Sequence, residues 1–183
     1  MRQWIDIISE GIDFRQQLET GYETFHEIAL DHAQNSFSED EELPDLSRET
    51  YLSMADEFLK DMLGRPLYRG MMVRQIDLEN AQHLGVFYSD LKGHSDSFAR
   101  GSSRYDGRFD HIEDGPDQVG VVIEIEPINN PNSIDLPITL AMNTFGGEGE
   151  VRLLEGEPVV IKRIVDQMGR GIWPHLWGQT YHA

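Results

Sequence analysis

The sequence predicts an α+β protein in which N-terminal helices pack on a mostly antiparallel, split β-sheet body. Helical periodicity fills the first third of the chain, and strand and turn patterns follow Pro66. The length of 183 residues suits one domain. We therefore expect a single domain over 1–183, with a helical part at 1–64, a β-rich core at 65–168 and an irregular tail at 169–183.

The first helix is indicated by four apolar side chains. Leu18, Tyr22, Phe25 and Ala29 follow the i, i+4, i+7, i+11 spacing that places them on one helical face. The acidic, proline-ended run at 36–44 then interrupts the pattern. We expect one amphipathic helix before this run.

A second helix is predicted to begin at a cap, either Ser47 or Asp45, and to end at Gly64, two residues before Pro66. Its apolar face is formed by Tyr51, Ala55, Phe58 and Met62.

After Pro66 the pattern becomes that of strands and turns, because short β-branched runs alternate with Gly, Asn, Asp and Pro clusters. The expected strands are Pro66–Val73, Gly85–Tyr88, Val119–Ile125, Val151–Leu154 and Val159–Val165. Short helical turns are expected at Asp77–Leu84, with Asp77 as the cap, and at Ser95–Ala99. In the tail, Trp173 and Trp177 are expected to pack against the body.

The formal net charge of −18 disfavours nonspecific binding to nucleic acid or to anionic membranes. Residues 1–64 hold 16 acidic side chains against 4 basic ones, so this part favours a basic protein partner. No apolar stretch is long enough for a membrane span, so we expect a soluble cytoplasmic protein. An anion would need the later basic residues, among them Arg65, Arg69, Arg74, Lys92, Arg100, Arg104 and Arg108.

Several catalytic classes are excluded by the composition. The chain has no cysteine, so it has no disulfide, thiolate metal site or cysteine nucleophile. His26 and His32 lie six positions apart, about 240° around a helix, whereas a zinc-binding helix needs two histidines four apart. Phosphate-loop, dinucleotide-fingerprint and nucleophile-elbow motifs are missing. We expect no metal.

Three polar segments stand out in the β-rich core. They are Leu67-Tyr68-Arg69-Gly70-Met71, Phe87-Tyr88-Ser89-Asp90 and Gly146-Gly147-Glu148-Gly149-Glu150-Val151. In this order they resemble the arginine, serine and Glu-x-Glu motifs of mono-ADP-ribosyltransferases, including bacteriophage enzymes that modify host proteins. The resemblance covers roughly residues 65–165. It implies an ADP-ribosyltransferase-like fold, NAD as co-substrate and, for a phage protein, a place in the host cytoplasm.

The resemblance implies that Glu150 and Glu148 are catalytic. Cleavage of the nicotinamide–ribose bond develops positive charge on the sugar, as in glycoside hydrolysis, and a fixed carboxylate stabilises that charge. Glu150 would be this carboxylate, and Glu148 would activate an arginine side chain of a protein target. Residues two apart on a strand share a face, but Gly149 permits a turn that would separate the two carboxylates.

The resemblance also implies a cofactor-binding group made of Arg69, its neighbours Tyr68 and Gly70, and Ser89. Arginine forms planar, charge-assisted hydrogen bonds with phosphate, which an acidic protein needs in order to hold NAD. Ser89 would brace the catalytic glutamate. Ser95, Ser97, Ser102 or Ser103 are alternatives for the serine, Lys92, Arg100 and Arg104 are further basic candidates, and Phe98 or Phe109 could stack on nicotinamide.

Two other functions remain open. The protein could be an acidic interaction protein that presents carboxylates in place of phosphates to a basic partner. It could also be a transferase fold that has lost its activity and only binds. The sequence does not decide the target, the acceptor residue or the oligomeric state.

Overall fold

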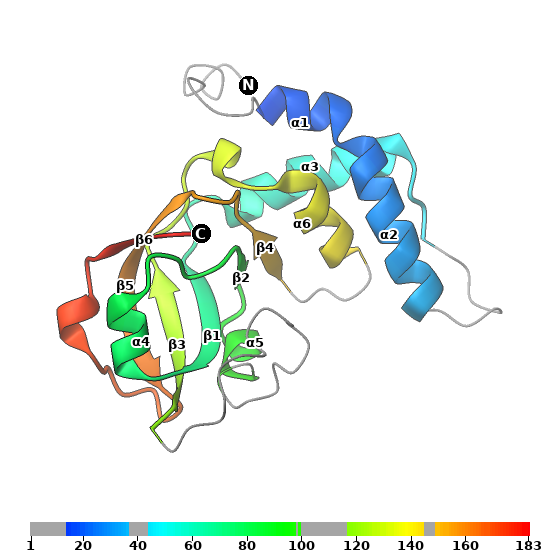
Figure 1. The fold of residues 1–183 in the computed structure, drawn as a ribbon. Helices are drawn as coiled ribbons and strands as arrows, with labels where there is room; N and C mark the ends of the chain where they lie inside the picture. Colours follow the sequence, from blue (N-terminus) through cyan, green and yellow to red (C-terminus); the bar gives the residue numbers. More distant parts are fainter. Residues whose placement is uncertain (1–13, 37–43, 98, 100–116, 145–148) are drawn as a thin grey trace. The chain divides into compact units, whose positions relative to one another are not determined.

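The computed structural model describes residues 14–36, 44–97, 99, 117–144 and 149–183. It divides into two compact units. The helical unit comprises residues up to Arg65 together with Ile128–Leu154, and the sheet unit comprises Pro66–Pro127 and Glu155–Ala183. Helices and an antiparallel sheet confirm the α+β class (Figure 1). A segment from the middle of the chain, Ile128–Leu154, belongs to the same unit as the N-terminal helices, which the sequence did not indicate.

The helical unit contains helices α1 (Phe14–Thr20), α2 (Tyr22–Ser36), α3 (Arg48–Met62) and α6 (Leu136–Asn143) and the short strand β4 (Glu150–Arg152). The predicted first helix is divided at Gly21 into α1 and α2. Of the two predicted caps, Ser47 and Asp45, it is Ser47 that caps α3. Its side chain accepts a hydrogen bond from the Thr50 amide.

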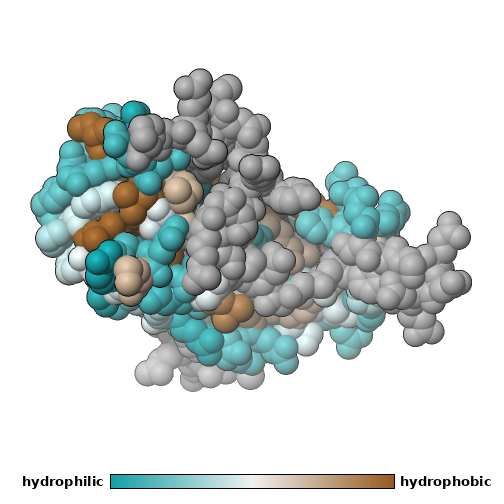
Figure 2. All heavy atoms as spheres, turned by 90° about the horizontal axis from the view of Figure 1, so that it is seen from below, coloured by the Kyte–Doolittle hydropathy of each residue, from teal (hydrophilic) through white to brown (hydrophobic). Residues whose placement is uncertain are grey.

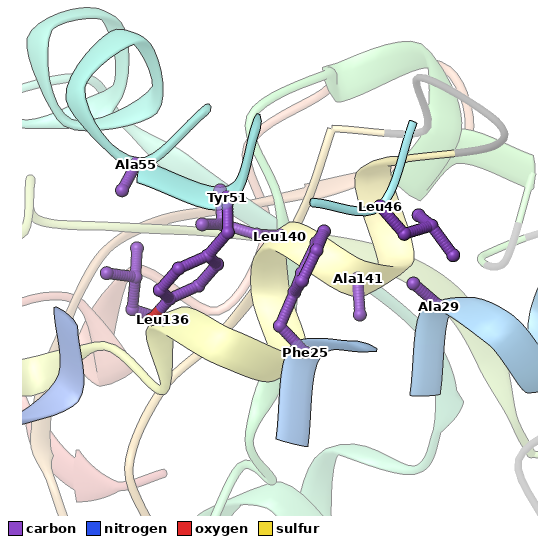
Figure 3. Packing of buried hydrophobic residues seen from close by; sticks show 8 residues of the cluster. All are labelled: Phe25, Ala29, Leu46, Tyr51, Ala55, Leu136, Leu140 and Ala141. Atoms are coloured by element: carbon purple, nitrogen blue, oxygen red, sulfur yellow. The ribbon is translucent and has the colours of Figure 1, made fainter. Parts of the chain in front are cut away.

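The core of the helical unit is built by the predicted apolar faces together with α6 (Figure 3). The rings of Phe25 and Tyr51 lie 5.1 Å apart between their centroids, and both side chains are fully buried. Leu136, Leu140 and Ala141 of α6 complete the same cluster. The N-terminal helices therefore bury their apolar faces against α6, a helix that the sequence analysis missed.

Gln17 fastens α1 to the segment that leads into α6. Its side-chain amide donates to the Ile134 carbonyl at 3.0 Å, and its side-chain oxygen accepts from the Leu136 amide at 2.9 Å. Both bonds are buried, so water does not replace them when they are lost.

We expect Gln17→Ala to lower the free energy of unfolding by about 2 kcal/mol, because two buried backbone groups would lose their partner. Gln16→Ala, one position earlier on the exposed side of α1, should change it by less than about 0.5 kcal/mol. Urea denaturation of the two variants measures the difference. Equal effects at both positions would contradict the role assigned to Gln17.

The sheet unit carries strands β1 (Leu67–Val73), β2 (Phe87–Ser89), β3 (Val119–Ile125), β5 (Pro158–Asp166) and β6 (Thr180–His182). Their order is β2-β1-β3-β5-β6, and each neighbouring pair is antiparallel. Helices α4 (Gln75–Asn80) and α5 (Lys92–Ser97) connect β1, β2 and β3 (Figure 1). Four of these strands match predicted runs.

Three expectations for the sheet unit were wrong. Asp77 does not cap α4, because Arg74 occupies the N-cap position and Asp77 lies in the first turn, where it accepts a 2.6 Å hydrogen bond from Arg74 Nε. The tail is not irregular throughout, since β6 pairs with β5. Trp177 remains 38% exposed instead of being packed down, although its indole donates to the Ile172 carbonyl.

Figure 2 shows one face of the described surface, and most of it is hydrophilic. On the face drawn in Figure 2, hydrophobic side chains form small separate patches among hydrophilic ones. Among the helices that the structure describes, none combines the length and the apolar character needed to cross a bilayer.

Asp166 closes the turn that follows β5. Its carboxylate accepts hydrogen bonds from the Arg170 amide, the Met168 amide and the Arg170 guanidinium. These bonds, the Arg170 amide first among them, hold the pKa of Asp166 below its usual value although partial burial opposes the shift.

A lowered pKa in the folded state means that Asp166 stabilises the fold above its unfolded-state pKa and loses this effect as the pH falls through the folded value. We therefore expect Asp166→Asn to melt at a lower temperature than the wild type at pH 7, with the difference shrinking below about pH 4. Melting curves between pH 7 and pH 2.5 test this. Asp117→Asn, an exposed aspartate in the same unit, serves as control; a pH-independent difference for Asp166→Asn would contradict the account.

Candidate functional site

Arg69 is enclosed by the segment that enters β2. It lies in the middle of β1, opposite Ile123 of β3, and its side chain is only 8% exposed. Its Nη1 donates to the Phe87 carbonyl at 2.6 Å. A Cβ atom at Gly85 would stand 2.8 Å from Nη2, so the missing side chain at Gly85 leaves room for the guanidinium. A buried cation is thus built into the junction of β1 and β2.

The Tyr88 ring also lies next to the Arg69 guanidinium. The Arg69 guanidinium carbon lies 5.9 Å from the centre of the Tyr88 ring, within the range of a cation–π contact. Burial raises the pKa of the Tyr88 phenol well above its usual value, and the neighbouring Arg69 opposes that shift only in part. Tyr88 is therefore neutral at physiological pH. Within the described residues its hydroxyl has no hydrogen-bond partner.

The predicted cofactor-binding residues occupy two faces of the sheet. Tyr68 pairs with Ser89 across β1 and β2, and paired residues share a face. Side chains alternate along a strand, so Tyr68, Gly70 and Ser89 are on one face, whereas Arg69 and Tyr88 are on the other. Strand pairing brings all four predicted residues close to one another in the sheet. Only Tyr68, Gly70 and Ser89 lie on the same face, and Arg69 lies on the opposite one.

The face that carries Ser89 is engaged in packing and turn formation. The Ser89 hydroxyl accepts from the Leu91 amide at 3.0 Å and donates to the Leu91 carbonyl at 3.3 Å. A Cβ atom at Gly70 would stand 1.8 Å from the Ser95 carbonyl oxygen, so α5 lies directly over this glycine. Ser95, one of the alternative serines, is 2% exposed. Packing against α5 is thus the local role of Gly70.

Charged groups flank Tyr68 on the same face. Lys162 forms a 2.8 Å ion pair with Glu124, which is opposite Tyr68 in the ladder. Burial, and after it the negative charge of Glu124, raises the pKa of Tyr68, while Lys162 lowers it. Tyr68 is consequently a neutral hydroxyl beside an ion pair.

Glu150 begins strand β4 in the helical unit and is half-buried. Its carbonyl accepts from the Asn143 side-chain amide at 2.6 Å, at the end of α6. Two residues later the Arg152 amide donates to the Thr139 hydroxyl at 3.0 Å, and Arg152 also forms an ion pair with Asp135. The start and the end of β4 are therefore both fastened to α6 and its N-cap.

Gly149 has a φ of +60°, in the left-handed region that glycine adopts readily. The residue before Glu150 is thus not extended, and the rule that residues two apart on a strand share a face does not apply to the Glu-x-Glu motif. Several candidates lie outside the described residues, namely Phe98, Arg100, Ser102, Ser103, Arg104, Phe109 and Glu148.

Sequence reasoning missed the contribution of residues 85–88 to the surroundings of Arg69. Tyr88 was part of the serine motif, yet only the tertiary structure shows its ring next to the guanidinium. Gly85 looked like an ordinary strand-flanking glycine. Its φ of +87° and its contact with Arg69 could not be read from a local pattern, because the contact spans strands.

The fold and the site define an α+β protein with a buried arginine at the junction of two antiparallel strands. No group of three or more His, Cys, Asp or Glu side chains able to hold a metal ion occurs in the described part of the chain. Comparisons with protein-family models, curated proteins and solved structures found no match to this chain.

Proposed function

We propose that the protein is an NAD-dependent mono-ADP-ribosyltransferase that transfers ADP-ribose to an arginine side chain of a protein target and releases nicotinamide. One observation above all supports this proposal. The arginine motif and the serine motif form neighbouring strands, and Arg69 donates to the backbone of the serine-motif strand across 18 positions of sequence. Two of the three motifs that resemble the family are therefore joined in the fold.

Each residue has a defined role in the proposed reaction. The Arg69 guanidinium would hold the NAD diphosphate, since phosphate is the anion that a planar guanidinium binds best. The bond between nicotinamide nitrogen and ribose C1 breaks, and its electron pair leaves with neutral nicotinamide. Glu150 stabilises the positive charge that remains on the sugar.

The acceptor step completes the reaction. A guanidine nitrogen of the target arginine forms the new bond to ribose C1, and Glu148 accepts the proton that this nitrogen loses. Ser89 would act by orienting a neighbouring group through a hydrogen bond and would not transfer protons.

The charge distribution supports a basic protein as the target. The acidic side chains of the described N-terminal helices and their connection are exposed and would steer a basic surface towards the protein. They are Glu19, Glu23, Glu27, Asp31, Asp45, Glu49, Asp56, Glu57 and Asp61.

The same exposed carboxylates favour a second function, that of a non-catalytic acidic protein that binds a basic partner. One experiment separates the two. The protein is incubated with a cell extract and NAD labelled in the adenylate phosphate, and both labelled protein and free nicotinamide are measured. Transferase activity gives label on protein, with ADP-ribose on arginine by mass spectrometry. If neither transfer nor NAD hydrolysis occurs while a basic partner binds, the enzymatic proposal fails.

A further inference from the structure

Two histidines from distant parts of the sequence lie side by side in the sheet unit. His83 belongs to the segment between α4 and β2, and His182 belongs to β6; the two form a parallel bridge. The bridge is fixed on both sides, because the Leu84 amide donates to the His182 carbonyl at 2.8 Å and the His182 amide donates to the Gln82 carbonyl at 2.9 Å. Bridged residues share a face, so both imidazoles emerge on the same side.

The distance between the two rings is compatible with one shared ion. Their centroids are 5.7 Å apart and their planes are inclined by 44°. Imidazole nitrogen binds zinc at about 2.1 Å, so two ring centres on the same ion are at most roughly 6.5 Å apart. Both side chains are exposed, which lets an ion reach them and lets water complete its coordination.

One of the rings already has the proton arrangement of a metal ligand. His182 Nδ1 lies 3.0 Å from the Gly156 carbonyl oxygen. A carbonyl oxygen can only accept, so Nδ1 carries the hydrogen, and in the neutral ring Nε2 keeps its lone pair. Metal-bound histidines usually donate their second nitrogen to a carbonyl or carboxylate in this way, which fixes the ring and its tautomer.

We propose that His83 and His182 form a two-imidazole site for a borderline-soft divalent transition-metal ion such as Zn²⁺. The site has two protein ligands, with water in the remaining positions, and the net charge of −18 favours a cation. Binding would tie the segment before β2 to β6. This segment continues into Gly85 and Phe87, which enclose Arg69. An ion that binds only the folded state stabilises the sheet unit by mass action.

The experiment uses the full chain, with any polyhistidine tag removed, in a buffer that does not bind metals. Calorimetric titration with Zn²⁺ should give one ion per chain, and an excess of Zn²⁺ should raise the melting temperature by about 3 °C or more. Cu²⁺ should bind more tightly than Zn²⁺, following the usual order for nitrogen ligands. His83→Ala and His182→Ala should each abolish both effects.

The matched control is His32→Ala, which removes a single exposed histidine from α2. This variant should bind Zn²⁺ like the wild type. Nitrogen-15 spectra of the wild type should show that Zn²⁺ shifts Nε2 of His182 and leaves Nδ1 protonated. The proposal is overturned if the wild type does not bind Zn²⁺, if the His32 variant loses as much binding as the His83 variant, or if equal Mg²⁺ displaces the ion. His83→Ala decides the matter if His182→Ala does not fold.

Discussion

Under the proposed transferase function, Glu150→Gln is expected to lower ADP-ribose transfer from NAD at least about 100-fold, because the uncharged amide would no longer stabilise the positive charge that develops on the ribose. The substitution keeps the size of the side chain. It also keeps the backbone carbonyl that accepts from Asn143, so the start of β4 should fold as in the wild type. The measurements are label transfer to extract proteins and nicotinamide release, both as initial rates.

Glu155→Gln is the matched control for this change. Glu155 is exposed, lies five positions further along the chain and loses the same single charge. Its variant should transfer ADP-ribose at the wild-type rate. Transfer by Glu150→Gln at more than about a tenth of the wild-type rate would remove Glu150 from the catalytic role, since a fixed electrostatic group of this kind contributes at least ~10² to the rate.

Gly70→Ala is expected to have the largest effect on stability. The added Cβ atom would stand 1.8 Å from the Ser95 carbonyl oxygen and 2.9 Å from the Ala99 amide nitrogen. Both are backbone atoms that cannot rotate away, so α5 would have to move off β1. Overpacking of this kind costs about 3 kcal/mol, which lowers the melting temperature by about 6 to 12 °C in a protein of this size.

Gly93→Ala provides the comparison within α5 itself. A Cβ atom at Gly93 has no neighbour within 4 Å, and alanine favours a helix over glycine by about 1 kcal/mol, so this variant should melt at the wild-type temperature or slightly above it. If Gly70→Ala also melted like the wild type, close packing of α5 would not be the role of Gly70. Its assignment to cofactor binding would then gain support.

The strands of the sheet unit could be predicted well because their signals are local. Val119–Ile125 is an uninterrupted apolar run between turn residues, and it forms β3 with the predicted bounds. The buried positions of α3 likewise follow from periodicity, since Tyr51, Ala55 and Met62 are buried as their spacing indicates. Such patterns depend on which side of one element faces the core, and the sequence of that element carries this information.

Helix α6 could not be predicted by the same method. Its sequence contains Pro137 and has buried residues around most of its circumference, including Leu136, Thr139 and Leu140, so no polar face creates a helical period. The proline occupies the first turn, where a missing amide does no harm. The helix is buried because α1, α2 and α3 cover it, and those contacts are distant in sequence.

In the candidate site, too, local motifs could be recognised from the sequence but contacts between strands could not. The order of the motifs in the sequence singled out Arg69, Ser89 and Glu150. The strands that carry the first two motifs are paired in the sheet, so these two motifs are neighbours in the structure. Arg69 and Ser89 lie on opposite faces because Tyr68, not Arg69, is paired with Ser89. A shift of one residue in the register of β1 against β2 would place Arg69 and Ser89 on the same face. The residues of the two motifs do not by themselves specify this register.

By itself, the sequence determined the α+β class and the acidic character of the N-terminal helices, because composition and periodicity are properties of single segments. Its motif order supplied only the resemblance on which the proposed NAD chemistry rests. Only the tertiary structure decided that Gly85 and Tyr88 enclose Arg69 and that His83 meets His182. These contacts join segments that chain order keeps apart, and backbone hydrogen bonds and packing between strands select them from the many pairs that the sequence would allow.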